Sequence, residues 1–230
     1  MEAQQNCPNC GALIGTGVPG LPVVTCGSCN SLLSKAGDAL SKVGEAGQVP
    51  FDVSPIQIGT RLTVGGAPNG QRGEIVGRER WAFDGGFWNE WLLQFPGGEA
   101  FWVAEETGKY MVMKEVEPTD EDIANIEAAQ RKANGGLGER VWIGCSPHFL
   151  SDIKRVRCVA VEGSLPHIIP AQQGRFSIDF RTKKGAVITY QRDRDGHSLW
   201  RGAYYRLEDL EPAGLRRFEH WSAPDFEVAR

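Results

Sequence analysis

Residues 78–102 read RERWAFDGGFWNEWLLQFPGGEAFW and hold eight of the chain's 21 aromatic residues. Two turn motifs, Asp84-Gly85-Gly86 and Pro96-Gly97-Gly98, divide this segment into three short runs. Glycine-containing loops between such runs are typical of β-hairpins. The segment therefore predicts a three-stranded antiparallel meander, with a three-residue loop at 84–86.

The length of that loop decides which side chains share a face of the meander. A three-residue loop sets Phe83 opposite Phe87 and Arg80 opposite Glu90, so that Trp81, Phe83, Phe87 and Trp91 form a core face. Aromatic rings beside carboxylates suit ammonium groups. We therefore predict a recognition site for a small cation, a polyamine or a peptide at Arg80, Trp88, Asn89 and Glu90, with Arg80, Trp88 and Glu90 on the other face.

Short apolar runs separated by glycine-rich turns continue on both sides of the meander. They predict a mainly β protein with one β unit over 58–117 and a second over 137–212, each a small barrel of SH3-like scale. A helix is expected between them over 118–136, capped by Thr119 or Asp120. A short echo between the two units leaves open whether they are a diverged repeat.

Four cysteines near the N-terminus form two Cys-x-x-Cys units, Cys7/Cys10 and Cys26/Cys29, separated by 15 residues. Two such units bring four thiolates to one ion, which closes a tetrahedral site. We therefore predict a structural zinc ribbon over residues 1–46. Iron is the alternative metal, because four thiolates also hold iron.

The segments around these units are expected to be simpler. Residues 31–43 favour a hairpin that completes the ribbon, with a weak helix as the alternative. Residues 47–57 are rich in glycine, proline and small polar residues, which indicates a linker. Residues 213–230 are interpreted as a charged, frayed tail.

The bulk composition excludes several classes of protein. The chain has 230 residues, 41% hydrophobic and 23% charged, which is typical of a globular protein. A net charge of −4 argues against a nonspecific nucleic-acid binder. No apolar run approaches the ~18 residues that span a bilayer, and the N-terminus has no signal-peptide pattern. A cytoplasmic protein without direct membrane insertion is predicted.

The remaining chemistry-bearing residues favour structural roles. Cys145 and His148 lie three residues apart, but a catalytic thiol needs a lowered pKa and an oriented base. Buried cysteines commonly act as small hydrophobic residues, so we expect Cys145 and Cys158 to be buried. The basic clusters around Arg155, Arg181 and Arg192 are interpreted as solvated surface.

Residues 73–116 resemble an uncharacterised bacterial family, domain of unknown function four-one-seven-eight. The resemblance rests on the segments at Gly73–Trp81, Asp84–Leu93 and Gly108–Tyr110, on Trp102 with Glu105, and on Glu162–Pro166 and Leu207–Leu210 in the second half. A four-cysteine ribbon fits many members. Members tend to be encoded beside polyamine-synthesis-like and membrane-associated partners. The resemblance therefore implies protein partners in a membrane-linked or stress-associated system.

Taken together, these patterns predict a noncatalytic binding or adaptor protein with a structural zinc site. Two alternatives stay open. The acids near the meander, Asp84, Glu90, Glu105 and Glu106, would suit an enzyme or enzyme accessory that acts on a small cationic or lipid-linked substrate. The zinc ribbon would suit a nucleic-acid binder, which the acidic net charge disfavours.

Overall fold

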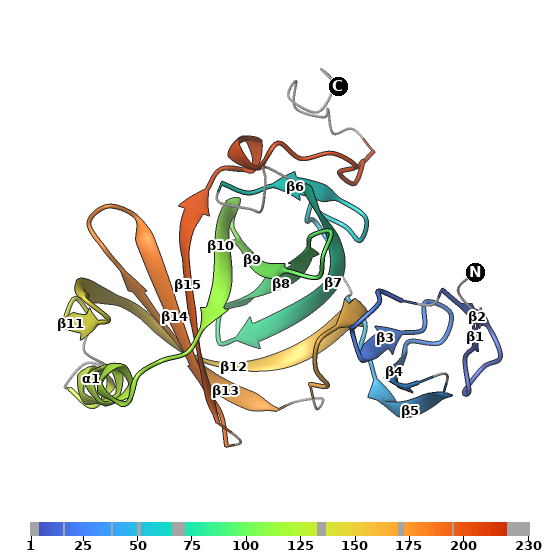
Figure 1. The fold of residues 1–230 in the computed structure, drawn as a ribbon, viewed down its shortest axis with the longest axis horizontal. Helices are drawn as coiled ribbons and strands as arrows, with labels where there is room; N and C mark the ends of the chain where they lie inside the picture. Colours follow the sequence, from blue (N-terminus) through green and yellow to red (C-terminus); the bar gives the residue numbers. More distant parts are fainter. Residues whose placement is uncertain are drawn as a thin grey trace.

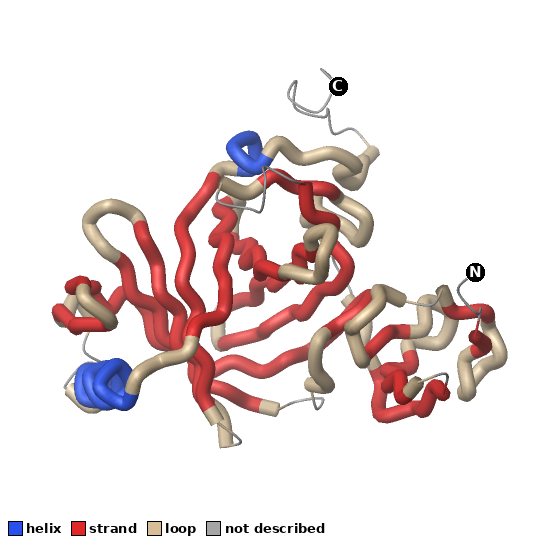
Figure 2. The backbone as a smooth tube through the Cα atoms, viewed as in Figure 1, coloured by secondary structure: helices blue, strands red, loops and turns tan. Residues whose placement is uncertain are grey.

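Strands form most of the computed structural model, which describes residues 5–15, 17–37, 39–49, 52–65, 72–132, 137–169, 173–194 and 196–219 (Figure 2). The mainly β prediction is confirmed. The N-terminal strands are β1 (Gln5–Asn6), β2 (Leu13–Ile14), β3 (Val23–Thr25), β4 (Ser31–Ala36) and β5 (Ala39–Glu45). The hairpin predicted over 31–43 is confirmed, because β4 and β5 pair antiparallel.

The rest of the chain forms a barrel and its coverings. Its strands are β6 (Arg61–Thr63), β7 (Arg72–Phe83), β8 (Gly86–Gln94), β9 (Ala100–Glu106), β10 (Lys109–Val116), β11 (Arg140–Ile143), β12 (Ser146–Leu165), β13 (Gly174–Arg181), β14 (Ala186–Arg192) and β15 (His197–Tyr205). The helices are α1 (Asp120–Gln130) and a 3₁₀ turn (Leu207–Leu210).

Eight antiparallel strands close into one barrel in the order β7, β8, β9, β10, β15, β14, β13 and β12, with β12 returning to β7. The expectation of two separate small barrels is therefore wrong. The physical reason is the length of β12, which has 20 residues. Its first half pairs with β13 and its second half with β7. The pairing of β10 with β15 closes the other seam between the two predicted units.

The loop between β7 and β8 has two residues, Asp84 and Gly85, and Phe83 pairs with Gly86. The predicted three-residue loop is wrong, because Gly86 belongs to β8. Side chains alternate between the two faces of a strand, so a shift of one residue moves every side chain of β8 to the opposite face. The observed pairs are Trp81 with Trp88 and Arg80 with Asn89.

Three hydrophobic clusters organise the barrel. The first lies inside it and includes Trp81, Trp88, Trp102 and Met111. The second covers the outer face of β7 to β10 and includes residues of the predicted linker and tail, such as Ile56 and Leu215. The third packs α1 and β11 on the outer face of β12 to β15. In Figure 1, α1 lies on the opposite side of the barrel from β1 to β5.

The helix and the chain ends follow local rules. Thr119 Oγ1 accepts a hydrogen bond from the Asp122 backbone N–H, and the Asp122 carboxylate accepts one from the Thr119 backbone N–H, which confirms Thr119 as the N-cap. The helix predicted over 118–136 is shorter than expected, because α1 ends at Gln130 with Arg131 as its C-cap. Arg216 pairs with Asp52 at 2.5 Å, so the described part of the predicted tail packs on the predicted linker.

Gly202 allows β10 and β15 to approach closely. A Cβ atom at this position would lie 1.8 Å from Val112 O, which is backbone and cannot move aside alone. We therefore expect Gly202→Ala to lower the free energy of unfolding by more than ~2 kcal/mol in chemical denaturation. Gly174→Ala is the control, because its nearest contact would be an ordinary 3.6 Å. Equal stability of the two variants would contradict this packing.

Candidate functional site

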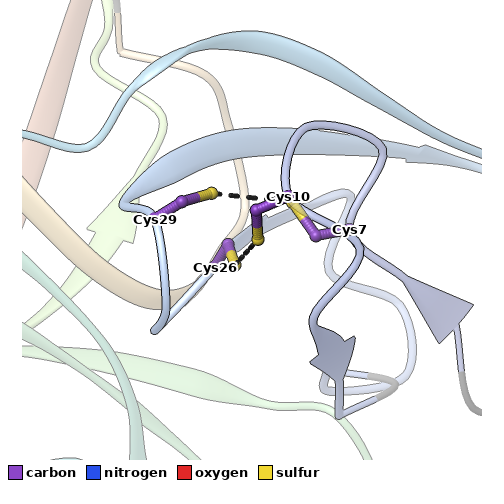
Figure 3. Close-up of side chains that lie close together, drawn as sticks. All are labelled: Cys7, Cys10, Cys26 and Cys29. Atoms are coloured by element: carbon purple, nitrogen blue, oxygen red, sulfur yellow. Dashed lines mark hydrogen bonds between the residues drawn. The ribbon is translucent and has the colours of Figure 1, made fainter.

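The two Cys-x-x-Cys units come together at the N-terminal module, defined here as β1 to β5. The four Sγ atoms of Cys7, Cys10, Cys26 and Cys29 all lie within 4.8 Å of one another (Figure 3). Cys7 Sγ lies 3.7 Å from Cys29 Sγ, and Cys10 Sγ lies 3.8 Å from Cys26 Sγ. A tetrahedral ion with ~2.3 Å bonds to sulfur requires edges of about 3.8 Å. The four cysteines therefore have the spacing to hold one metal ion.

Each cysteine pair is shaped by a turn with a left-handed residue after its second cysteine. Gly11 has φ 76° and donates its backbone N–H to Cys7 O, and Asn30 has φ 55° and donates to Cys26 O. Glycine and asparagine tolerate this conformation best. The residue types after Cys10 and Cys29 therefore follow from the backbone geometry that aims the sulfurs.

Polar neighbours favour the thiolate form of Cys29. Ser31 Oγ lies 3.2 Å from Cys29 Sγ, and Asn9 Nδ2 donates to it at 3.5 Å. These contacts lower the pKa of the Cys29 thiol to about 5, with the Ser31 hydroxyl as the largest cause. A metal ion binds the thiolate and not the thiol. Cys29 is thus chemically suited to bind a metal ion as a thiolate.

The predicted recognition residues divide between the two faces of the barrel wall. Arg80 and Asn89 lie on the outer face, where Arg80 Nε donates to Asn89 Oδ1 at 2.9 Å. Asn89 Nδ2 and Trp91 Nε1 both donate to Glu105 Oε2. All four residues are buried. This network holds the covering layer on β7 to β9, and it does not join Trp88 and Glu90 in one groove.

Trp88 and Glu90 point into the barrel and line a cavity of about 610 Å³. The cavity also takes in Asp152 and Lys154 from β12, Asp179 from β13 and Thr189 from β14. These residues occupy inward positions, as the pairings of Asp152 with Asp179 and of Asp179 with Thr189 require. A polar cavity inside the barrel was not predicted from the sequence.

The floor of the cavity is a charged layer across the barrel. Glu90 accepts hydrogen bonds from Trp88 Nε1 and Arg175 Nη2, both at 3.0 Å. The Arg175 guanidinium carbon lies 3.3 Å from the centroid of the Trp81 ring. Burial raises the pKa of Glu90 although Arg175 opposes the rise. In the same layer Glu79 accepts from Trp81 Nε1 and lies 3.4 Å from His167 Nε2.

The wall above the floor carries a second group of charges. Lys154 forms an ion pair with Asp152 and lies 4.8 Å from the ring centroid of Phe83. Asp179 accepts a hydrogen bond from Thr189 Oγ1 at 2.7 Å. Burial within the barrel raises the pKa of Asp179 to about 6. The cavity therefore offers a carboxylate that titrates near neutral pH.

The alternation of residue types in β13 is the sequence signal for this interior. In β13 the apolar Phe176, Ile178 and Phe180 alternate with polar residues. Such alternation normally places the polar side chains in water. Here Ile178 and Phe180 pack outside the wall beneath α1, and the alternate positions of Arg175 and Asp179 face the barrel interior. The pattern alone cannot tell these two arrangements apart.

The structure also shows where the two remaining cysteines, His148 and the acids near the meander lie. Cys158 is buried as expected, and burial raises the pKa of its thiol to about 12. Cys145 is exposed, so its predicted burial is wrong, because it lies in the turn between β11 and β12. His148 is buried, and its Nδ1 lies 3.0 Å from Ser146 O. Of the acids near the meander, Glu90 and Glu106 line the cavity, whereas Glu105 belongs to the outer network.

No family model, curated protein or solved structure matches the chain. The family resemblance of residues 73–116 therefore stays a prediction. The helices in the part of the chain that the structure describes are too short or too polar to cross a membrane.

Proposed function

We propose that the protein is a noncatalytic binding protein whose barrel cavity takes a small cationic ligand. The observation that carries this proposal is the cavity of about 610 Å³ that Trp88, Glu90 and Asp179 line inside a closed barrel. Ligand pockets in proteins range from about 300 to 1,000 Å³ and combine apolar walls with a few polar groups. Small barrels of this strand number commonly hold one small ligand.

Charged groups of both signs line the cavity. The acids are Glu90, Glu106, Asp152, Asp179 and Asp209, and the bases are Lys109, Lys154, Arg181 and Arg206. Lys154 is already paired with Asp152, and Arg206 is paired with Glu208 and Asp209. Lys154 also lies within 5.9 Å of the Trp88 ring centroid. A cation already rests against the aromatic wall, which supports the cavity as an environment for an ammonium group.

The N-terminal module is proposed to bind one structural zinc ion. Cysteine is its only ligand type, and four protein ligands leave no coordination position for water or substrate. The module joins the barrel where Val23 and Val24 of β3 pair with Leu165 and Ser164 of β12. A structural metal would stabilise that end of the barrel. The protein partners implied by the family resemblance would be sought by affinity purification from the native host.

Tryptophan fluorescence tests ligand binding in the cavity. Spermidine should change the emission of the wild-type protein with a saturating, submillimolar titration. Trp88→Phe should lose most of that change, because Trp88 lines the cavity. Trp142→Phe is the matched control, since Trp142 is 51% exposed on β11 and should respond as wild type. No change at millimolar spermidine, or equal binding of the neutral diol of the same chain length, would overturn the proposal.

A further inference from the structure

We propose that Asp179 is the anion that receives the ligand's ammonium group, and that acidification releases the ligand by protonating this carboxylate. The inference rests on the proposed cation-binding function and adds to it the pairing residue and a form of regulation.

Asp179 is the carboxylate of the inner wall that the protein leaves without a charged partner. Among the described residues the Asp179 carboxylate receives one hydrogen bond, from the neutral hydroxyl of Thr189, and it has no ion pair. It lies on β13 at an inward position and lines the cavity. Asp179 is partly buried, and removing a carboxylate from water without a cation beside it is costly. A ligand ammonium group at this position would supply the missing charge.

Two other carboxylates that line the cavity, Glu90 and Asp152, already have cations. Glu90 pairs with Arg175 at 3.0 Å and also accepts from Trp88 and Gln191. Asp152 pairs with Lys154. A ligand cation at either carboxylate would compete with a fixed side chain, whereas at Asp179 it would replace nothing. Binding of the ligand's cation is therefore expected to depend mainly on Asp179.

The charged groups that face Asp179 change the pKa of its carboxylate. Asp152 and Glu90 raise its pKa by repulsion, and Lys154 lowers it by attraction, in addition to the larger effect of burial. Tyr204 of β15 faces the same space, and Asp179 raises the pKa of its phenol. With a folded-state pKa of about 6, Asp179 is mostly ionised at neutral pH and mostly neutral one unit below its pKa.

Spermidine binding measured by calorimetry at two pH values tests the proposal without any substitution. Because only the ionised carboxylate attracts an ammonium group, the wild-type Kd should rise about tenfold between about pH 7.5 and about pH 5. Asp179→Asn should raise the Kd about 10- to 100-fold at the higher pH and remove most of the pH dependence. Its amide oxygen still accepts from Thr189, so the fold should persist, which a thermal melt would check.

Glu121→Gln is the matched control, because Glu121 is an exposed carboxylate on α1 and does not line the cavity. Its Kd should stay within about threefold of the wild-type value. Wild-type affinity in Asp179→Asn, or a wild-type Kd that does not change with pH, would overturn this inference and leave the proposed function standing. Failure of the wild-type protein to bind spermidine at either pH would overturn both.

Discussion

Cys7→Ser is expected to abolish metal binding and to unfold the N-terminal module. Cys7 and Cys26 are 3% and 2% exposed, and the cluster around them contains few other apolar side chains. Structural zinc in small modules contributes an apparent ~10–16 kcal/mol, which a core of this size cannot replace. The purified wild-type protein should hold one zinc ion per chain, and the variant none, when the metal is measured by atomic absorption.

The barrel should survive this loss, because it closes without the N-terminal module. The sheet pairing between the module and β12 has two residue pairs, whereas β12 pairs with β7 over Arg157 to Gly163. Hydrogen exchange should therefore accelerate in β1 to β5 and stay slow in β7 and β8. Cys145→Ser is the control, since Cys145 is exposed and lies outside the cluster. A Cys7→Ser protein that still binds one zinc ion would contradict the metal assignment.

Arg175→Met should destabilise the barrel by about 3–5 kcal/mol near pH 7.5, because removal of one partner leaves a buried charge unpaired. Arg175 is the cation that faces both Glu90 and the ring of Trp81. Glu79 lies directly opposite Glu90 in the sheet and adds a second buried carboxylate to the same layer. The loss would be measured by urea unfolding.

The destabilisation caused by Arg175→Met should depend on pH. The protonation of Glu90 determines whether it grows or shrinks as pH rises. Burial already raises the pKa of Glu90 above its ordinary value, and loss of the Arg175 cation would raise it further. A carboxyl group with a raised folded-state pKa binds a proton in the native state, so it favours folding in acid and loses that contribution as pH rises. The stability gap between Arg175→Met and wild type should therefore be smaller near pH 4.5 than near pH 7.5.

Two further variants separate the charge effect from lost packing. The double variant Arg175→Met with Glu90→Gln removes both charges and should recover more than half of the loss. Arg155→Met is the matched surface control, because Arg155 stacks on Phe176 outside the barrel and is exposed; it should cost less than ~1 kcal/mol. If Arg175→Met lowered the free energy of unfolding by less than ~1 kcal/mol, the charged layer described for the cavity floor would be contradicted.

Local features of this fold follow from the sequence because short-range chemistry sets them. The cysteine spacing and the residues Gly11 and Asn30 predict the four-sulfur cluster, and Thr119 predicts the start of α1. The strand-rich character follows from the glycine turns and short apolar runs. Each of these rests on contacts between residues that are near in sequence.

The barrel closure and its polar interior depend on contacts that no local pattern contains. Cys158 pairs with Trp81 across 77 positions, and nothing in either segment specifies the other. The register of β7 and β8 depends on whether Gly86 belongs to the loop or to the strand. Because Gly86 belongs to the strand, Trp88 lies on the same face as Trp81 and Trp91 lies on the other face, the reverse of the prediction. Polar residues of β13 face the interior because other strands curve around them.

The indole N–H resonances of Trp88 and Trp91 provide the most direct test of a ligand site inside the barrel. The two residues are three positions apart and lie on opposite faces of the wall, where Trp88 Nε1 donates to Glu90 and Trp91 Nε1 donates to Glu105. Titration with spermidine in heteronuclear NMR should shift the Trp88 resonance and leave the Trp91 resonance in place. A Trp88 resonance that stays fixed at saturating spermidine, or a shift of Trp91 alone, would contradict a cation site in the cavity.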